Sequence, residues 1–436
     1  MKPELLMPAG DMEKLKTAFQ YGADAVYAGV PMFSLRAREQ MFNIKSVKEA
    51  VDYTRSLGKK IYLTLNIFPH NYKIPALKNA LKPLAELKPD AFIMADPGVI
   101  MLSKEIAPEI PIHLSVQANN VNWASAKFWH KQGIERIILS REISLAEVKG
   151  IHEMNPNLEL EFFVHGSICM AYSGRCLLSN YFSYRDANQG TCAHSCRWQY
   201  KVHEAHSKRE IDQEEAEKRG FKELDHDYYL EEISRPGEYM EIAEDEHGTY
   251  IMNSRDMCLV EYLKDLKDAG VCSFKVEGRN KTVFYVATVA KTYRQAIDDM
   301  EAGKPFNPEH ITELAKTSNR GFIPGFLMAN PREKAQEYKK NITHQTHEFV
   351  GIIRNIHERD HQKLYEVEVK GRIDVPDTVE VFSPSKSFKY EMVKIMNLNG
   401  EELKVVHPGQ KDKVLIELPE EVEIGAMIRK ERAHHI

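Results

Sequence analysis

The sequence predicts a mixed α/β fold in which a (β/α)8 TIM-barrel-like N-terminal domain precedes a small C-terminal β-barrel. Short apolar, β-rich runs alternate with amphipathic helical segments through the first two thirds of the chain. After residue 342 the pattern changes to alternating strands with short turns. The 436 residues allow two or three domains, fewer if one is a barrel. We place the domains at 1–335 and 343–436.

Seven apolar runs are the predicted barrel strands. In chain order they are Glu4–Met7, Ala25–Ala28, Ile61–Leu65, Ala91–Ala95, Ile112–Val116, Arg136–Leu139 and Leu158–Val164. The segments between them, such as 11–21, 46–56 and 122–132, have apolar residues three and four positions apart, as crossover helices over a parallel sheet do. A later run, Tyr250–Met252 or Ser273–Val276, is available to close the ring. This count favours a closed barrel over an open doubly wound sheet.

Most predicted strands end in polar or glycine residues. In parallel α/β barrels the catalytic groups lie at the C-terminal ends of the strands. We therefore expect one mouth that gathers Asn66, Asp96, Gln117, Arg141, Glu142, His165 and Glu277.

Two later segments differ from the barrel pattern. A stretch dense in charged residues at about 203–248 contains KREIDQEEAEKR and EIAEDEHG, and we interpret it as a solvated helical surface insertion, with partner docking as the alternative. The runs EFVGIIRNI, LYEVEVKG, DTVEVFSP and KVLIEL then predict a small β-barrel of roughly 90 residues.

Composition excludes several classes of protein. Hydrophobic residues at 43% and charged residues at 28% are typical of a soluble globular protein, not of a disordered, collagen-like or disulfide-scaffold chain. A net charge of -5 gives no global sign of nucleic-acid binding, although a local basic patch stays open. The N-terminus does not resemble a secretory signal, and no run approaches the roughly 18 apolar residues of a spanning helix. We expect a cytoplasmic protein without membrane association.

The cysteines are crowded. Four of the six lie within one loop-rich segment, at Cys169, Cys176, Cys192 and Cys196, and the other two are Cys258 and Cys272. In a reducing compartment such cysteines are not expected to form structural disulfides. Glycines in the same segment let the backbone pass close to a bulky group, and neighbouring arginines balance the charge of thiolates.

Thiolate sets suit both zinc and iron-sulfur clusters. Structural zinc usually has two close cysteine pairs, whereas only Cys192 and Cys196 are close here. The scattered spacing favours an iron-sulfur cluster, with zinc as the alternative metal and redox-active or inert thiols as a further interpretation. Cys272 lies within the apolar run 271–276 and is predicted to be a core strand residue.

Longer motifs carry a resemblance to a known family. These are E-x-F-x-x-G-x-x-C at 161–169, S-G-x-C-x-x-S at 173–179, N-Q-G-x-C-A-x-x-C-R-W at 188–198, SRDMC at 254–258 and FKVEGR at 274–279. The opening ELLMPAGD and the later NRGFIPGF add to them. Together these motifs resemble the collagenase-like peptidase family, the thirty-second among peptidases of unknown catalytic type, over about three quarters of the chain.

Within that family the chain is similar to the subgroup of tRNA hydroxylation proteins. The resemblance implies oxygen-independent hydroxylation of the tRNA wobble uridine to 5-hydroxyuridine, with prephenate as the hydroxyl donor. It also implies a 4Fe-4S cluster, and the matching motifs point to Cys169, Cys176, Cys192 and Cys258 as its ligands. Cys196 is the alternative for the fourth position.

A dicarboxylate donor calls for guanidinium groups in the site, because arginine binds a carboxylate with two parallel hydrogen bonds. Arg141, Arg175 and Arg279 are the candidates, and Glu277 and His165 complete the predicted catalytic set. For tRNA, basic residues of the C-terminal domain, Lys370, Arg372 and Lys389, offer a candidate contact surface.

Two other functions stay open. The first is a collagenase-like endopeptidase, in which Cys169 would act with His165 or His194. The second is a non-catalytic RNA-binding or complex-forming subunit. The sequence leaves open whether a paralogue or a second copy of the chain is a partner.

Overall fold

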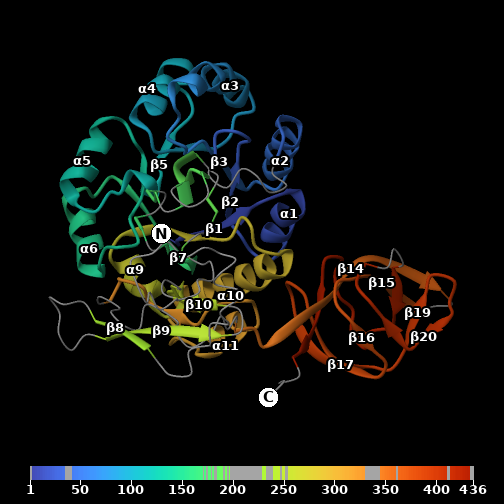
Figure 1. Cartoon of the computed structure of the whole chain (residues 1–436). Coiled ribbons are helices and arrows are strands. Elements are labelled where there is room, and N and C mark those ends of the chain that lie inside the picture. The colour runs from blue at the N-terminus through green and yellow to red at the C-terminus, as the bar shows by residue number, and fades with distance from the viewer. Residues whose placement is uncertain are drawn as a thin grey trace, which may run out of the picture.

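The computed structural model describes most of the chain (Figure 1). The described residues are 2–34, 42–169, 171–172, 175–177, 179–180, 184–189, 192–193, 196, 228–231, 239–245, 248–250, 254–328, 344–359, 362–409 and 413–432.

Eight parallel strands form a closed barrel. They are β1 (Glu4–Ala9), β2 (Ala25–Gly29), β3 (Lys60–Thr64), β4 (Ala91–Met94), β5 (Ile112–Leu114), β6 (Arg136–Ile138), β7 (Glu159–Ser167) and β12 (Val271–Val276). Neighbours follow chain order from β1 to β7, and β12 pairs in parallel with both β1 and β7. The predicted barrel is confirmed, and the run at 273–276 supplies the eighth strand. The alternative was wrong, because Tyr250 belongs to a separate sheet.

Helices surround the barrel strands (Figure 1). They are α1 (Met12–Gln20), α2 (Ile44–Ser56), α3 (Ile74–Glu86), α4 (Pro97–Ile106), α5 (Trp123–Lys131), α6 (Leu145–Met154), α9 (Leu263–Asp268), α10 (Val283–Glu301) and α11 (Glu309–Leu314). Side chains fix several starts: Asp11, Asn122 and Thr282 each accept a hydrogen bond from the backbone N–H three residues later. Within the described residues, every helix is too short or too polar to cross a membrane.

Further strands extend the sheet beside the barrel mouth. β11 (Asp256–Cys258) pairs antiparallel with the end of β7, and β13 (Phe322–Ile323) pairs with β11. One-turn helices lie at η1 (Asn71–Lys73), η2 (Val116–Ala118), η3 (Ala187–Gln189) and η5 (Val260–Tyr262).

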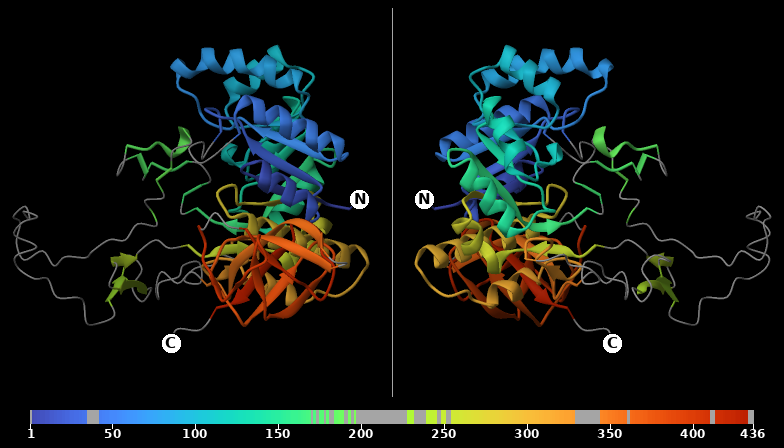
Figure 2. Two further views of the ribbon diagram at one scale, coloured as in Figure 1. Left: turned by 90° about the vertical axis from the view of Figure 1, so that its right-hand side faces the viewer. Right: turned by 90° about the vertical axis from the view of Figure 1, so that its left-hand side faces the viewer.

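The charged insertion is described only in part. Its described residues form the antiparallel strands β8 (Tyr228–Glu231), β9 (Tyr239–Asp245) and β10 (Gly248–Tyr250), which stand apart from the barrel in Figure 2. The helical expectation was therefore wrong for these residues, whose aromatic and alternating apolar side chains suit a strand. The rest of 203–248 lies outside the described residues.

The C-terminal domain is an antiparallel half-barrel. Its strands are β14 (His347–Arg359), β15 (Gln362–Val369), β16 (Ile373–Asp374), β17 (Asp377–Phe382), β18 (Ser387–Met392), β19 (Ile395–Asn397), β20 (Glu402–Leu403), β21 (Val405–Val406), β22 (Val414–Ile416) and β23 (Met427–Glu431). Eight of them form one sheet, whose outer strands β18 and β20 do not pair with each other. The small C-terminal β domain predicted from the sequence is thus confirmed, as a half-barrel whose sheet stays open between β18 and β20. The boundary placed between residues 335 and 343 lies outside the described residues.

The two domains share a packed interface beside α10 and α11 (Figure 1). Phe284 of α10 stacks on Phe349 of β14, with ring centroids 5.2 Å apart. The fully buried side chain of Arg429 forms ion pairs at 2.6 Å with Glu313 of α11 and with Glu380 of β17. One guanidinium group therefore links both domains.

Removing this guanidinium group should destabilise the chain. Arg429→Ala leaves Glu313 and Glu380 largely buried without this partner, so we expect the free energy of unfolding to fall by about 3–5 kcal/mol. Arg372→Ala is the control: Arg372 is 60% exposed beside Asp374, so its loss should lower the free energy of unfolding far less. Urea denaturation measures both variants, and equal losses would contradict the role given to Arg429.

The same ion pair predicts a pH dependence. Burial alone would raise the pKa of Glu380, but hydrogen bonds and charge from Arg429, with help from Lys316, bring it from 4.5 to about 2. Because the folded-state pKa lies below the ordinary value, the stabilisation is complete above about pH 4.5 and is lost as the pH falls toward 2. Between about pH 4.5 and 2, the free energy of unfolding should therefore fall more for the wild-type chain than for Arg429→Ala.

Candidate functional site

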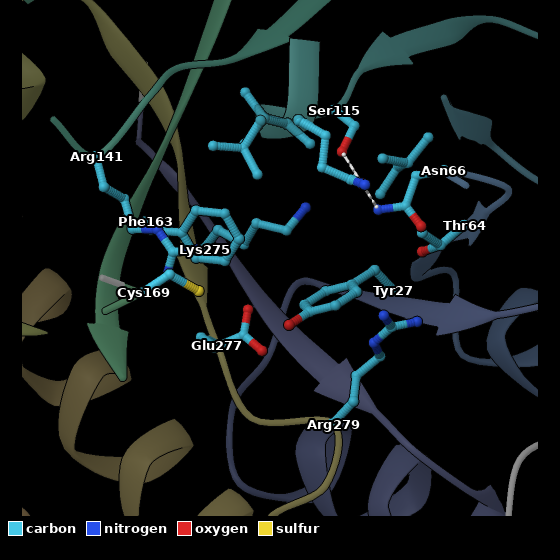
Figure 3. A pocket seen from close by; sticks show the side chains of 14 residues that line it. Tyr27, Thr64, Asn66, Ser115, Arg141, Phe163, Cys169, Lys275, Glu277 and Arg279 are labelled. Atoms are coloured by element: carbon cyan, nitrogen blue, oxygen red, sulfur yellow. Dashed lines mark hydrogen bonds between the residues drawn. The ribbon is translucent and has the colours of Figure 1, made fainter. Parts of the chain in front are cut away.

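A cavity opens at the C-terminal ends of the barrel strands and encloses about 570 Å³ of empty space, part of it open to solvent. The lining residues are Tyr27, Thr64, Asn66, Ile93, Ser115, Val116, Gln117, Ile138, Arg141, Phe163, Cys169, Lys275, Glu277 and Arg279 (Figure 3).

Six residues singled out in the sequence lie together in this cavity: Asn66, Gln117, Arg141, Cys169, Glu277 and Arg279. Arg175 lies beside it, where its Nε donates to the Gln117 carbonyl at 3.2 Å. Two other strand-end residues serve local structure. Asp96 caps α4 by accepting from the backbone of Val99, and Glu142 accepts a hydrogen bond from Ser140.

Arg141 and Arg279 lie on opposite sides of the cavity, with Lys275 and Glu277 between them (Figure 3). Arg141 donates from Nη1 to the Ser167 carbonyl at 2.7 Å, and its guanidinium group lies 4.6 Å from the Phe163 ring centroid. Arg279 donates from Nη1 to Ser34 Oγ at 2.5 Å. Each guanidinium group is thus held in place by a neighbour and is positioned to contact an anionic ligand.

Lys275 was missed as a site residue, because the run at 273–276 was considered only as a closing strand. Its Nζ bonds Glu161 Oε1 at 2.6 Å, and both side chains are almost fully buried. Burial lowers the pKa of Lys275, although the charge of Glu161 opposes that shift. A lysine between Phe274 and Val276 of a buried strand was the available signal.

A wider charge network surrounds this pair inside the barrel. Arg136 of β6 bonds Glu161 at 3.2 Å and Glu4 of β1 at 2.8 Å. The Tyr62 hydroxyl also donates to Glu4, at 2.7 Å. Each buried charge therefore has a partner of opposite sign, as the low-polarity interior of a barrel requires.

His165 does not line the cavity. Its ring is 1% exposed and packs against Tyr285, Tyr293 and Phe322, with Nδ1 3.3 Å from the Tyr293 hydroxyl. Burial lowers its pKa to about 3, so the ring is neutral at neutral pH. No hydrogen bond joins it to Cys169 among the described residues. His194, the other histidine considered for a cysteine peptidase, lies outside the described residues.

The cysteines expected to ligate a cluster lie on β11 and in the segment that follows β7. Cys169 lines the cavity, whereas the buried Cys258 on β11 places its Sγ 3.7 Å from the Tyr293 hydroxyl, and burial raises its pKa to about 11. Cys176, Cys192 and Cys196 lie partly buried in the loop segment. Across the described ranges, no three His, Cys, Asp or Glu side chains are arranged to hold a metal ion.

Two remaining sequence expectations concern other surfaces. Cys272 lies on β12 as predicted and is partly buried, with its thiol donating to the Leu160 carbonyl at 3.4 Å. In the C-terminal domain, Lys370 pairs with Glu368 and Arg372 with Asp374. Lys389 lines a second hollow that also contains Asp377, Glu380, Glu391 and Glu431. Carboxylates thus offset the proposed basic patch.

Comparison with known proteins covers nearly the whole chain. The family model Peptidase family U32 matches residues 10–337, and the model of the Peptidase family U32 C-terminal domain matches residues 345–429. The tRNA hydroxylation protein P of Escherichia coli (strain K12) is 44% identical, over 97% of this chain and 95% of the relative. Its namesake in Haemophilus influenzae is 42% identical, over 97% and 95%.

A relative with a different name is also similar. A collagenase of Porphyromonas gingivalis is 27% identical, over 94% of this chain and 93% of the relative. The family therefore includes proteins named for two different activities. Both family models match this chain, one after the other, and the relatives are similar over nearly their full length. The chain therefore belongs to peptidase family U32.

Proposed function

We propose that this chain is a tRNA-modifying enzyme that hydroxylates the wobble uridine to 5-hydroxyuridine and takes the hydroxyl group from prephenate. The observation that carries the proposal is the 44% identity, over nearly the full length of both chains, with a protein named for tRNA hydroxylation. The cavity agrees with a small anionic co-substrate, because Arg141, Lys275 and Arg279 all line it.

The roles of the lining residues follow from their chemistry. Arg141 and Arg279 bind carboxylate oxygens of the donor, since a guanidinium group offers paired N–H donors in one plane. Tyr27 and Phe163 supply aromatic walls against the donor or the base. A wobble uridine lies in a loop, where an unstacked base can enter a pocket at a lower cost than from a duplex.

A 4Fe-4S cluster bound by Cys169, Cys176, Cys192 and Cys258, or by Cys196 in the fourth position, remains part of this proposal. Its support is the resemblance of the cysteine motifs, not the described arrangement of the thiols. No role in the reaction is assigned to it.

The function is tested in cells that lack the native gene. Expression of this chain should restore 5-hydroxyuridine in tRNA, measured by mass spectrometry of nucleosides. The modification should disappear in cells that cannot make prephenate. Its persistence in those cells would remove prephenate as the donor, and its absence in all cells would remove the hydroxylase activity.

The peptidase alternative is supported by the similarity to the Porphyromonas gingivalis collagenase. A cysteine peptidase needs a base near its thiol, and the described structure keeps His165 outside the cavity that Cys169 lines. Cleavage of gelatin by the purified chain, abolished by Cys169→Ser, would favour this alternative.

We expect that donor binding requires arginine at positions 141 and 279 and that lysine cannot replace it. Arg141→Lys and Arg279→Lys keep the charge but lose the two-pronged contact, which costs on the order of 2 kcal/mol, about thirtyfold in donor affinity. The measurement is 5-hydroxyuridine in tRNA when prephenate supply is limited. Wild-type modification in both variants under that limit would exclude these arginines from donor binding.

The cluster has its own test. If thiolates ligate iron, anaerobically purified Cys169→Ala and Cys176→Ala should be bleached and low in iron, because a cluster depends on each ligand. Cys272→Ala should keep its iron, since its thiol bonds the Leu160 carbonyl in the barrel wall. Full iron content in the first two variants, or zinc in the wild-type protein, would contradict the cluster.

A further inference from the structure

We propose that Lys275 and Gln117 form a donor pair inside the cavity that binds one carboxylate of a small dianionic ligand. This inference rests on the proposed function and adds to it the two residues that bind one carboxylate of the co-substrate. The two residues come from separate parts of the barrel: Lys275 lies on β12, and Gln117 lies in η2 just after β5, three strand positions away around the ring.

The first donor is the Lys275 amine. Figure 3 shows its tip inside the ring of lining side chains. Lysine carries three N–H groups when charged. Among the described residues, its amine has one hydrogen-bond acceptor, Glu161 at 2.6 Å. The remaining N–H groups are therefore available to an oxygen of a ligand in the cavity.

The second donor is the side-chain amide of Gln117, a residue that is only 1% exposed. Its Oε1 accepts hydrogen bonds from Ser115 Oγ, at 3.1 Å, and from Asn66 Nδ2. These contacts fix which end of the amide is the oxygen. The opposite end, Nε2, is buried and has no hydrogen-bond partner in the described part of the chain. Such a buried donor is costly unless a ligand satisfies it.

Charge defines the class of ligand. Among the lining residues Arg141, Lys275 and Arg279 are cationic, and Glu277 is the one carboxylate. Glu161 lies behind Lys275 and is shared with Arg136, so it does not neutralise the cavity by itself. Three cationic side chains against one carboxylate among the described lining residues favour a ligand with two carboxylates over a ligand with one. One carboxylate of that ligand contacts the donor pair, and the arginines contact the other.

A purely structural role explains only part of this geometry. An ion pair with Glu161 accounts for the burial of Lys275, but it gives no partner to Gln117 Nε2. A carboxylate between the two groups satisfies both at once. Oxygen acceptors are required, because both groups can only donate.

Gln117→Glu is the sharpest test, since it keeps the size and the acceptor oxygen that Ser115 and Asn66 contact. It replaces the amide donor with a negative charge. Isothermal titration of the purified full-length chain would compare prephenate, with two carboxylates, phenylpyruvate, with one, and succinate as a plain dicarboxylate. Wild-type protein should bind prephenate at least roughly tenfold more tightly than phenylpyruvate.

In Gln117→Glu we expect prephenate affinity to fall by about tenfold or more and the preference over phenylpyruvate to shrink. Lys275→Met should behave in the same way. Gln132→Glu, at the exposed C-terminal end of α5, makes the same charge change away from the cavity and should bind like the wild type. If Lys275→Met does not fold, Gln117→Glu decides.

The outcomes separate this inference from the proposed function. Wild-type affinity for prephenate in Gln117→Glu and in folded Lys275→Met would overturn the donor pair and leave prephenate as the donor. Binding of succinate but not prephenate, weakened by Gln117→Glu, would support the donor pair and exclude that donor. Failure of the wild-type chain to bind either dicarboxylate would overturn the inference.

Discussion

The buried ion pair between Glu161 and Lys275 is the interaction on which the barrel and its cavity both depend. It joins β7 to β12, the two strands that close the ring. Arg136 extends the link to β6 and, through Glu4, to β1. Removing Glu161 would leave Lys275 without an ion-pair partner among the described residues, and an uncompensated buried charge is far costlier than the loss of an exposed ion pair. The chain thus closes its barrel with the same lysine that faces the cavity.

The segment that follows β12 carries Glu277 and Arg279 and is held against the end of β7 by close backbone contacts. Gly166 has φ +112°, and a Cβ at this position would lie 2.8 Å from the Glu277 carbonyl oxygen. Only glycine lets the end of β7 pass so close to the segment that carries Glu277 and Arg279. Tyr285 of α10 donates its hydroxyl to the Glu277 carbonyl at 2.8 Å and holds the segment from its other side. Strand closure, a close backbone approach and one helix together position the charged groups of the mouth.

Strand positions and the barrel mouth were predictable because both depend on local sequence patterns. Apolar runs identify buried parallel strands, and the residue after each run lies at one known end of the barrel. That reasoning placed Gln117, Arg141 and Glu277 in one cavity. It was misleading for His165, because β7 extends to Ser167 and pairs there with β11. Its ring therefore packs in the core beneath α10, a long-range pairing that no local pattern reveals.

The roles of Lys275 and Gln117 depend on long-range contacts and could not be predicted from the sequence. A lysine within an apolar strand signals a buried charge, but its partner Glu161 lies 114 positions away. The unsatisfied amide of Gln117 appears only once Asn66 and Ser115 are seen to occupy its oxygen. The ligand set of the cysteines has the same limit, because part of the segment 170–200 that carries three of them lies outside the described residues.

The chemistry of the cavity also helps to choose between the two activities, tRNA hydroxylation and collagen cleavage, for which members of the family are named. A fold supports many chemistries, so the activity must be argued from the site. An endopeptidase must accept an extended backbone, which is neutral and offers as many donors as acceptors. The described cavity instead presents donors: two guanidinium groups, an ammonium and an amide, against one lining carboxylate. This imbalance suits a compact, acceptor-rich anion better than a peptide, and it favours the group-transfer chemistry proposed here over hydrolysis of a protein chain.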